Sequence, residues 1–417
     1  MKVLMVVDGT YLPKMDGVVV SILNTTDYLV KKGHEVFIFA PEAKDYKDKK
    51  QENITIHRFK SVPIPTYPEG RVSFPRAKKF INLVREIEPD IIHTHSPGPL
   101  GILATIAGKK FDIPLISTYH TSFPDFLMYV SPVKILKLDK LFAKKDPGKE
   151  TELEKKFDKF IKKIHESKFE ERRKRLSRKA VLAITNQFYN RNDLVIAPAK
   201  RTKKELIEYN IKAKVKVISN GLHITKFKKK TKYNKFPKFL HVGRLSFEKR
   251  IDVILDAMAL VIKNYPEATL TIIGKGPAME SLEAQSLRLN LKNNVKFKGF
   301  VKRDRLPEIY REHDVFVTAS EMETQGIVLL EALASGLPVI GVNMLATPDV
   351  VHNNKTGFLV KKGDSKKMGK RMIQLIQKPK LVREMGVNAR KEAKKHDIRN
   401  VMKTLEKTYL KLARFNK

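Results

Sequence analysis

Short apolar segments of strand length alternate with helical segments along most of the chain, and this alternation constrains the fold more than any other feature. In the first half, residues 2–7 and 35–39 are predicted strands on either side of a helix at residues 21–32. The same half carries further strand segments at 90–93, 114–117, 194–197 and 215–218, and a helix near 100–107. Strands that are apolar throughout are typical of a parallel sheet that helices cover on both faces. The first half is therefore predicted to be a doubly wound α/β domain.

The alternation restarts after residues 226–238, which are polar, basic and without periodicity and which we interpret as a linker. A chain of 417 residues is also too long for one ordinary hydrophobic core. We therefore predict two doubly wound parallel-sheet domains, residues 1–225 and 239–395, with a ligand cleft between the carboxyl ends of the two sheets. The second half has predicted strands at 239–242, 268–273, 295–297, 315–318 and 339–341, and predicted helices at 251–264, 279–289 and 326–334.

Cysteine is absent, which excludes structural disulfides, thiolate metal sites and cysteine nucleophiles. The N-terminus has only a short apolar run before Asp8, so no cleavable signal peptide is expected. No segment reaches the roughly 18 to 20 apolar residues that a membrane-spanning helix needs. Any contact with a membrane is therefore expected to be peripheral.

The net charge of +38 is concentrated in two parts of the chain. Residues 133–238 and 361–417 together contribute +35, whereas residues 239–360 carry 14 basic and 14 acidic side chains. This segregation favours an anionic partner over a general bias in composition. Charge alone leaves a nucleic-acid binder open as an alternative. Because the chain has no zinc finger, recognition-helix pattern or aromatic RNA-binding signature, no specific nucleic acid is expected.

Two cations follow the first predicted strand of the second half. In the segment GRLSFEK (243–249), a glycine ends the strand, and Arg244 and Lys249 lie five positions apart in a loop that opens a helix. An arginine fork and a lysine point charge suit phosphate oxygens. The alternative is that these are surface cations paired with Glu248 or Asp252.

Two acids flank a helix start further along the chain. Glu323 and Glu331 are eight residues apart, slightly more than two helical turns, so both could face one side of a loop and its following helix. Gly326 at the helix start exposes backbone amides that favour oxygen-rich ligands. Two acids here and two cations in the earlier loop suit a sugar joined to a diphosphate. The alternative is that the acids only complement the helix dipole.

Together, GRLSFEK (243–249) and ETQGIVLLEALASGLPVI (323–340) resemble the nucleotide-sugar-binding motifs of family 4 retaining glycosyltransferases. The resemblance covers nearly the whole chain except about 140–175. It implies the GT-B fold, in which two Rossmann-like domains face each other across a cleft, and a final helix at 396–417 that returns to the first domain. Similar motifs occur in family order in the first half: YLPKMDGVVVSI (11–22), KKGHEV (31–36), PDIIHTHSPG (89–98), STYHTSFPDF (117–126), NDLVIAPAKRTKKEL (192–206) and VKVISNGL (215–222).

The resemblance implies roles for individual residues of the second half. Arg244 and Lys249 match the pair that binds the donor diphosphate, and Glu323 matches the acid that contacts the transferred sugar. Glu331 matches the acid that holds the ribose. The other matched positions act through their backbone: Gly326, Ile327 and Val328 on the sugar, and Gly299, Phe300 and Val301 on the base.

In the first half, Gly17 matches the glycine that approaches the phosphates, and His120 matches the imidazole near the reacting sugar. An enzyme of this kind retains the anomeric configuration, and front-face attack assisted by the departing phosphate is expected. Arg244, Lys249 and helix N-terminal amides would stabilise the charge that develops on the leaving diphosphate. The nucleoside-diphosphate sugar is thus expected as a substrate, with no obligatory cofactor.

No dedicated metal site is expected, because the chain has neither an Asp-x-Asp pair nor a cysteine. His93 and His95 are two residues apart on one predicted strand face, a spacing that permits metal binding. The missing third ligand favours a structural role for both. His120 has an equally plain alternative as a polar residue with satisfied hydrogen bonds.

The sequence departs from the family pattern in two places. After Asn220 and Gly221, the family has an aliphatic residue and then an acid, whereas this chain has Leu222 and His223. The tryptophan common near the start of the last helix is also missing, and residues 396–398 occupy that region. Interdomain or acceptor contacts and local packing are expected to differ there.

Residues 150–179, which overlap the insertion at about 140–175, form a predicted basic amphipathic helix. Such a helix can lie in an anionic membrane interface, or it can pack its apolar stripe on the domain. Sequence alone leaves both open. The apolar stripe consists of Leu153, Phe157, Phe160, Ile161 and Ile164.

The ETQG form of the acidic motif and the YHTS segment are similar to those of family members that glycosylate diacylglycerol-type lipids. The expected reaction is transfer of a hexose, glucose, from UDP-glucose to a membrane lipid. The expected location is cytoplasmic and peripheral to an anionic membrane, which the enzyme contacts through basic residues of 133–238 and 361–417. A soluble or polyprenyl-linked glycan is the alternative acceptor.

Overall fold

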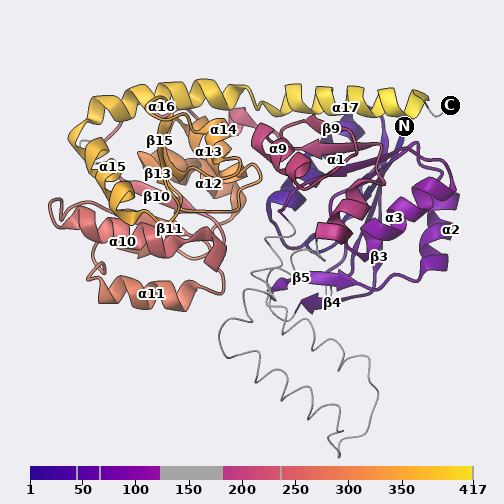
Figure 1. Cartoon of the computed structure of the whole chain (residues 1–417), viewed down its shortest axis with the longest axis horizontal. Helices are drawn as coiled ribbons and strands as arrows, with labels where there is room; N and C mark the ends of the chain where they lie inside the picture. Colours follow the sequence, from indigo (N-terminus) through magenta and orange to yellow (C-terminus); the bar gives the residue numbers. More distant parts are fainter. Residues whose placement is uncertain (44–45, 65–66, 123–181, 235–236, 416–417) are drawn as a thin grey trace, which may run out of the picture.

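A seven-stranded parallel sheet forms the first half of the chain, in the order β3-β2-β1-β6-β7-β8-β9 (Figure 1). The computed structural model describes residues 1–43, 46–64, 67–122, 182–234 and 237–415. The strands are β1 (Lys2–Val6), β2 (Glu35–Pro41), β3 (Ile54–Phe59), β6 (Ile91–Thr94), β7 (Leu115–Thr118), β8 (Leu194–Ala197) and β9 (Val215–Val217). The helices described here are α1 (Gly17–Lys31), α2 (Ala77–Ile87), α3 (Pro99–Lys110) and α9 (Lys200–Glu208). The predicted helix at 150–179 lies outside the described residues.

A six-stranded parallel sheet forms the second half, in the order β12-β11-β10-β13-β14-β15. Its strands are β10 (Phe239–Val242), β11 (Leu270–Ile273), β12 (Val295–Phe297), β13 (Val315–Val317), β14 (Val339–Val342) and β15 (Gly357–Val360). Its helices are α10 (Ile251–Ile262), α11 (Met279–Arg288), α12 (Leu306–Glu312), α13 (Ile327–Ser335), α14 (Thr347–Val350), α15 (Ser365–Gln377) and α16 (Pro379–Lys394). The prediction of two parallel-sheet α/β units is confirmed.

Both sheets are buried on both faces. In β1, Val3 and Met5 belong to one hydrophobic cluster, and Leu4 and Val6 belong to the cluster on the opposite face. Side chains alternate between faces along a strand, so a run without polar residues has two apolar environments to fill. This is why the strands could be predicted from their apolar runs.

The structure differs from the sequence prediction in several elements. Strands β3 and β15 and helices α2, α9, α12, α14, α15 and α16 were not predicted. Helix α1 begins at Gly17, four residues before the predicted start, because the Asp16 side chain caps it by accepting a hydrogen bond from the Val19 amide at 2.9 Å. An antiparallel ribbon of β4 (Ser61–Ile64) and β5 (Tyr67–Ser73) was not predicted. The earlier start brings Gly17 to the N-terminus of a helix that faces the second half.

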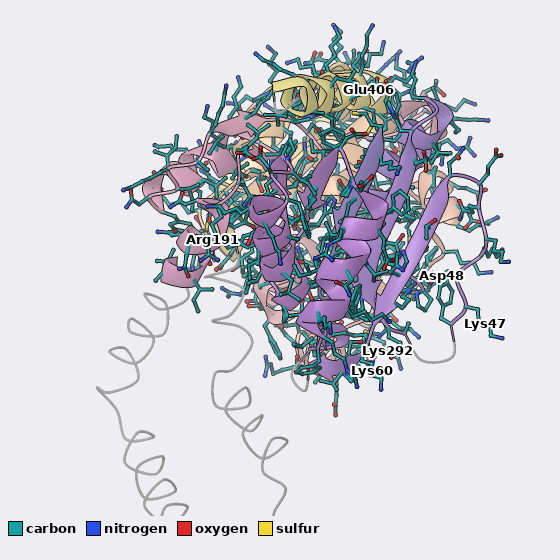
Figure 2. All side chains as sticks on the ribbon, turned by 90° about the vertical axis from the view of Figure 1, so that its right-hand side faces the viewer. Lys47, Asp48, Lys60, Arg191, Lys292 and Glu406 are labelled. Carbon is teal, nitrogen blue, oxygen red and sulfur yellow. The ribbon has the colours of Figure 1, made fainter. Side chains whose placement is uncertain are left out.

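The last helix, α17 (Ile398–Phe415), lies against the first sheet although it ends the chain. On its polar side, Glu406 accepts a hydrogen bond from the Tyr28 hydroxyl at 2.8 Å, and its other oxygen lies 3.1 Å from His34 Nε2. Figure 1 shows α16 along the top of the second half and α17 along the top of the first half, and Figure 2 labels Glu406 on α17. Its buried residues share a cluster with β1: Ile398, Val401, Met402, Leu405 and Tyr409.

Candidate active site

Lys249 and Glu323 meet at the carboxyl edge of the second sheet. Lys249 ends the short 3-10 helix after β10, and Glu323 lies in the loop between β13 and α13. Because β10 and β13 are neighbouring parallel strands, both loops leave the same edge. The Lys249 Nζ to Glu323 Oε1 distance is 2.6 Å, and the side chains are only 22% and 12% exposed. The two residues that the sequence assigned to the diphosphate and the sugar are therefore in direct contact.

Burial and pairing act in opposite directions on the pKa values of this pair. Burial by itself lowers the pKa of the Lys249 ammonium, but the Glu323 charge outweighs it and leaves that pKa raised. Burial likewise raises the pKa of Glu323, and the Lys249 charge and hydrogen bond outweigh it and leave that pKa lowered. Both groups therefore stay ionised near neutral pH. The alternative partners Glu248 and Asp252 do not hold the Lys249 ammonium, which bonds Glu323.

Glycines let the two halves approach each other here. A Cβ placed on Gly17 would lie 3.6 Å from Ile327 Cδ1, so the start of α1 faces the start of α13. Gly326 precedes α13 with φ +72°, and a Cβ there would lie 3.1 Å from Glu323 Oε2. This left-handed conformation favours glycine. The predicted phosphate glycine and the predicted sugar-binding helix start therefore lie opposite each other.

His120 is joined to the same loop of the second half. Its backbone oxygen accepts a hydrogen bond from Thr324 Oγ1 at 2.5 Å. The next residue, Gln325, accepts from the Asn220 amide at 2.8 Å and donates to Ser219 Oγ at 2.6 Å. The sequence analysis did not predict these contacts. The residues that make them, Thr324 and Gln325, are the two that separate Glu323 from Gly326 in the motif. The motif that carries the sugar acid also holds the halves together.

The His120 ring belongs to a buried histidine cluster. Its Nε2 lies 2.9 Å from His95 Nδ1, and the His95 ring lies 4.2 Å from that of His93. His93 in turn bonds the Tyr409 hydroxyl of α17 at 2.5 Å and Thr118 Oγ1 at 2.7 Å. Both ring nitrogens of His93 are thus engaged within the protein, as a structural role requires. Among the described residues, no group of three potential ligands for a metal is present.

Burial sets the protonation of this cluster. It lowers the pKa of His93 and of His120 to about 3, and it lowers that of His95 well below its usual range, with the neighbouring histidines adding to the effect on His93 and His95. The rings are therefore neutral at physiological pH. His120 can offer one ring nitrogen to a ligand as a neutral hydrogen-bonding group.

Glu331 lies in α13 and has its own partners. Its carboxylate accepts hydrogen bonds from Arg303 Nη2 at 2.8 Å and from the Tyr310 hydroxyl at 3.0 Å. Burial raises its pKa, and Arg303 and Tyr310 only partly oppose that effect. Glu331, in the middle of α13, therefore forms an ion pair with Arg303, and the sequence analysis predicted neither Arg303 nor Tyr310 as its partner.

The remaining predicted residues follow β10 and β12 at this edge. Arg244 is half-buried directly after β10. In the loop after β12, Gly299 has φ +65°, and Phe300 is 67% exposed. Val301 packs on the same hydrophobic cluster as Ile327 and Val328 of α13. The predicted base-binding loop and the predicted sugar-binding helix start therefore share one packing unit.

The two departures from the family pattern lie at the junction of the halves. The Leu222 amide donates to the His396 carbonyl at 2.8 Å, and Leu222 is itself buried. His396 Nδ1 lies 2.9 Å from Ser219 Oγ, so a hydrogen bond is formed in the region where the tryptophan is missing. His223 lines a crevice of about 610 Å³ together with Arg303.

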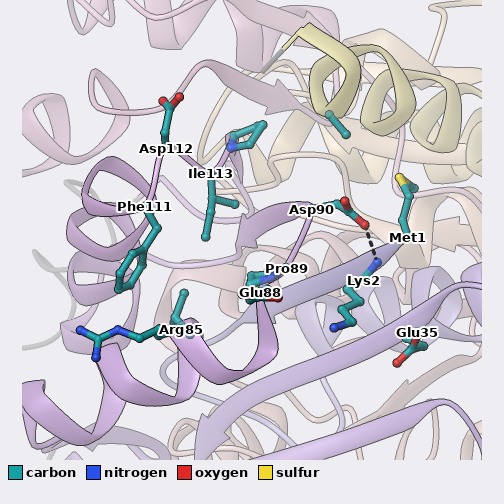
Figure 3. A pocket seen from close by; sticks show the side chains of 13 residues that line it. Met1, Lys2, Glu35, Arg85, Glu88, Pro89, Asp90, Phe111, Asp112 and Ile113 are labelled. Atoms are coloured by element: carbon teal, nitrogen blue, oxygen red, sulfur yellow. Dashed lines mark hydrogen bonds between the residues drawn. The ribbon is translucent and has the colours of Figure 1, made fainter. Parts of the chain in front are cut away.

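Another crevice, of about 730 Å³, lies at the opposite edge of the first sheet (Figure 3). Its lining includes Lys2, whose amide donates to Asp90 at 2.9 Å, and none of the candidate site residues.

None of the described helices is long and apolar enough to cross a membrane.

Family models match both halves. The model for Glycosyltransferase Family 4 matches residues 15–226, and the model for glycosyl transferases group 1 matches residues 223–392. An alpha-monoglucosyldiacylglycerol synthase of Streptococcus pneumoniae is 28% identical over 79% of this chain and 69% of its own length. One of Acholeplasma laidlawii is 26% identical over 96% of this chain and 95% of its own length.

Solved structures share the fold. The crystal structure of Anabaena Alr3699/HepE in complex with UDP and glucose has a TM-score of 0.69 and 20% sequence identity, covering 98% of this chain and 99% of its own. With two facing parallel-sheet domains and this similarity, the fold is GT-B, as the motifs predicted.

Proposed function

The chain belongs to Glycosyltransferase Family 4, and on that premise we propose that it transfers glucose from UDP-glucose to a diacylglycerol-type membrane lipid with retention of anomeric configuration. Family membership makes it a transferase that uses a sugar donor. The donor, the acceptor and the stereochemistry are the proposal. Relatives named as alpha-monoglucosyldiacylglycerol synthases support the lipid acceptor over a soluble or polyprenyl-linked glycan.

One observation carries the donor site: Lys249 and Glu323 touch at 2.6 Å at the sheet edge that faces Gly17 through Ile327. The contact places a cation for the diphosphate beside an acid for the sugar. When the donor enters, the diphosphate takes the Lys249 ammonium and a sugar hydroxyl takes the Glu323 carboxylate. Each charged group exchanges one partner for another, so neither is left buried alone.

The reaction depends on the charge of the leaving diphosphate. In this proposal, Arg244, Lys249 and the backbone amides of Gly326, Ile327 and Val328 lie around the bond that breaks. Fixed donors stabilise charge where it develops and need no reorganisation at that moment. The acceptor hydroxyl attacks from the face that the diphosphate leaves, and its proton passes to a phosphate oxygen. The proposal requires no metal or other cofactor.

The other site residues have supporting roles in the proposal. Glu331 holds the ribose, and the backbone of residues 299–301 contacts the base. The neutral His120 ring donates or accepts a hydrogen bond at the transferred sugar. None of these roles needs a protonated imidazole, in keeping with the lowered pKa of that ring.

The acceptor would reach the site from a membrane surface. Long-range attraction between basic residues of 133–238 and 361–417 and anionic headgroups would hold a cytoplasmic enzyme on the bilayer, at about 1 kcal/mol per cation near the surface. The proposal includes no specific nucleic-acid partner.

The experiment is product analysis by mass spectrometry, with a panel of nucleotide sugars offered together with diacylglycerol in anionic vesicles or with soluble sugars. We expect a hexosyl lipid with UDP-glucose, and loss of turnover in Glu323→Ala. Equal or better activity on soluble sugars would overturn the lipid acceptor. Full turnover by Glu323→Ala would overturn the assigned site.

A further inference from the structure

Arg250 directly follows Lys249, the proposed diphosphate ligand, and has an unusual backbone conformation. Its φ and ψ are +48° and 44°, a left-handed conformation that residues other than glycine, asparagine and aspartate seldom adopt. Such strain persists only where surrounding contacts hold the residue in place. The side-chain contacts of Arg250 therefore need an explanation.

The Arg250 guanidinium joins two loops. On its own loop, Nε and Nη2 donate to the Asp252 carboxylate at 3.1 and 2.9 Å. Across the site, Nη1 donates to Glu321 Oε1 at 2.9 Å. Glu321 is only 5% exposed and also accepts from Lys362 Nζ, at 2.8 Å on its other oxygen. A buried carboxylate held by two cations is a fixed anchor.

The two loops joined in this way are those that carry the donor-binding residues. Arg250 is next to Lys249, and Glu321 is two residues before Glu323. The backbone supports the same junction, because the Glu321 amide donates to the Glu248 carbonyl at 3.2 Å. We propose that Arg250 is a positioning residue. Together with Glu321, it holds the loop that carries Lys249 and the loop that carries Glu323 at the spacing that donor binding requires.

This role matters most while the donor binds. In this structure, the Lys249–Glu323 ion pair ties the two loops together alongside the Arg250–Glu321 bridge. The proposed function, on which this inference rests, requires that pair to open so that the lysine meets the diphosphate and the acid meets the sugar. The Arg250–Glu321 bridge lies outside that exchange and stays closed, so the spacing between the phosphate and sugar contacts is kept.

The kinetic test uses Arg250→Asn, since asparagine tolerates the left-handed conformation and removes the guanidinium. We expect the KM for the nucleotide sugar to rise about tenfold, with the KM for the lipid and kcat little changed. Glu321→Gln should raise the KM for the nucleotide sugar by a similar factor. The double variant should raise that KM little further, because the two residues are coupled. Arg250→Lys should recover part of the loss. A merely structural role would lower kcat through lost active protein and leave both KM values unchanged, and that result would overturn the proposal.

The matched control is Arg399→Gln. Arg399 makes the same type of contact to an acid two residues away, at 3.0 and 2.9 Å to Asp397, but on the outside of the last helix. Its loss should leave the donor KM unchanged. An equal rise in that variant would show that the effect is not specific to the bridge.

A second readout does not depend on the reaction. Selective-label NMR titration of the Glu323 carboxyl should show its pKa rising in Arg250→Asn, because loosened loops weaken its contact with Lys249. An unchanged Glu323 pKa would overturn the bridge even if the enzyme transfers glucose. If the wild type transfers no sugar, the proposed function fails, and this titration still decides whether Arg250 positions the pair.

Discussion

Acid should destabilise the first half of the chain through its buried histidines, and His93 allows the effect to be calculated. The His93 side chain is 2% exposed, and burial lowers its pKa from 6.5 to about 3. Between these two values, the unfolded chain takes up a proton that the folded protein cannot accommodate. Stability is therefore unaffected above pH 6.5, falls as the pH decreases below 6.5, and levels off below about 3.

At pH 5 the loss through His93 alone is about 2 kcal/mol, since each pH unit below 6.5 costs about 1.36 kcal/mol. The assay is native-state hydrogen exchange by mass spectrometry on peptides of β1, β6 and β7, at pH 7 and pH 5 after correction for the intrinsic exchange rate. Peptides of one sheet are needed because two-domain proteins need not unfold in one step.

The perturbation is His93→Gln, which keeps a neutral hydrogen-bonding side chain. We expect its loss of stability between pH 7 and pH 5 to be about 2 kcal/mol smaller than that of the wild type. Tyr409→Phe serves as the control, because it removes a partner of His93 and leaves the buried ring in place. The free energy of unfolding of that variant should be about 1 kcal/mol lower than that of the wild type at both pH values. If His93→Gln retained the full wild-type pH dependence, the assigned cause would be refuted.

Three further substitutions test the site residues. Gly326→Ala should lower the free energy of unfolding by about 1 to 2 kcal/mol, because of its positive φ and its approach to Glu323, and should also lower the initial rate of transfer. An unchanged denaturant-unfolding midpoint would contradict this prediction. Gly17→Ala should leave the free energy of unfolding within about 0.5 kcal/mol, since its Cβ meets Ile327 at an ordinary 3.6 Å, but should raise the KM for the nucleotide sugar. Glu331→Gln should raise the KM for the nucleotide sugar and not that for the lipid, and equal changes in both would contradict a ribose contact.

The strands were the most predictable part of the fold. Residues 194–197 and 239–242 were predicted with the bounds of β8 and β10, because a strand buried on both faces consists of one unbroken apolar run. Helix α15 was not predicted, although Met368, Met372 and Leu375 recur at helical spacing along it and are buried. The signal was present but is diluted by the lysines on its exposed face. The β4–β5 ribbon has no such pattern, and its pairing depends on tertiary contacts.

The site was predictable as a set of positions and not as a set of contacts. The motifs placed Lys249 and Glu323 in loops after two strands, and the parallel sheet brings such loops to one edge. The partners of the motif residues lie on other loops, as Arg303 does for Glu331, and nothing in local spacing connects them. Arg250 was within the predicted loop, but its role depends on a backbone conformation that composition does not reveal.

The neutrality of residues 239–360 also has a structural explanation that counting charges could not supply. Three basic residues of the proposed donor loops are paired with acids from the same stretch: Lys249 with Glu323, Arg250 with Asp252 and Glu321, and Arg303 with Glu331. In three of these pairs the acid is at most 12% exposed, and buried or partly buried pairs are screened much less by salt than exposed ones. The surplus of basic residues elsewhere in the chain includes exposed side chains such as Lys212, whose long-range field is screened over about 10 Å at 0.1 M salt. Added salt should therefore weaken attraction to an anionic surface far more than it weakens the ion pairs within the proposed donor site.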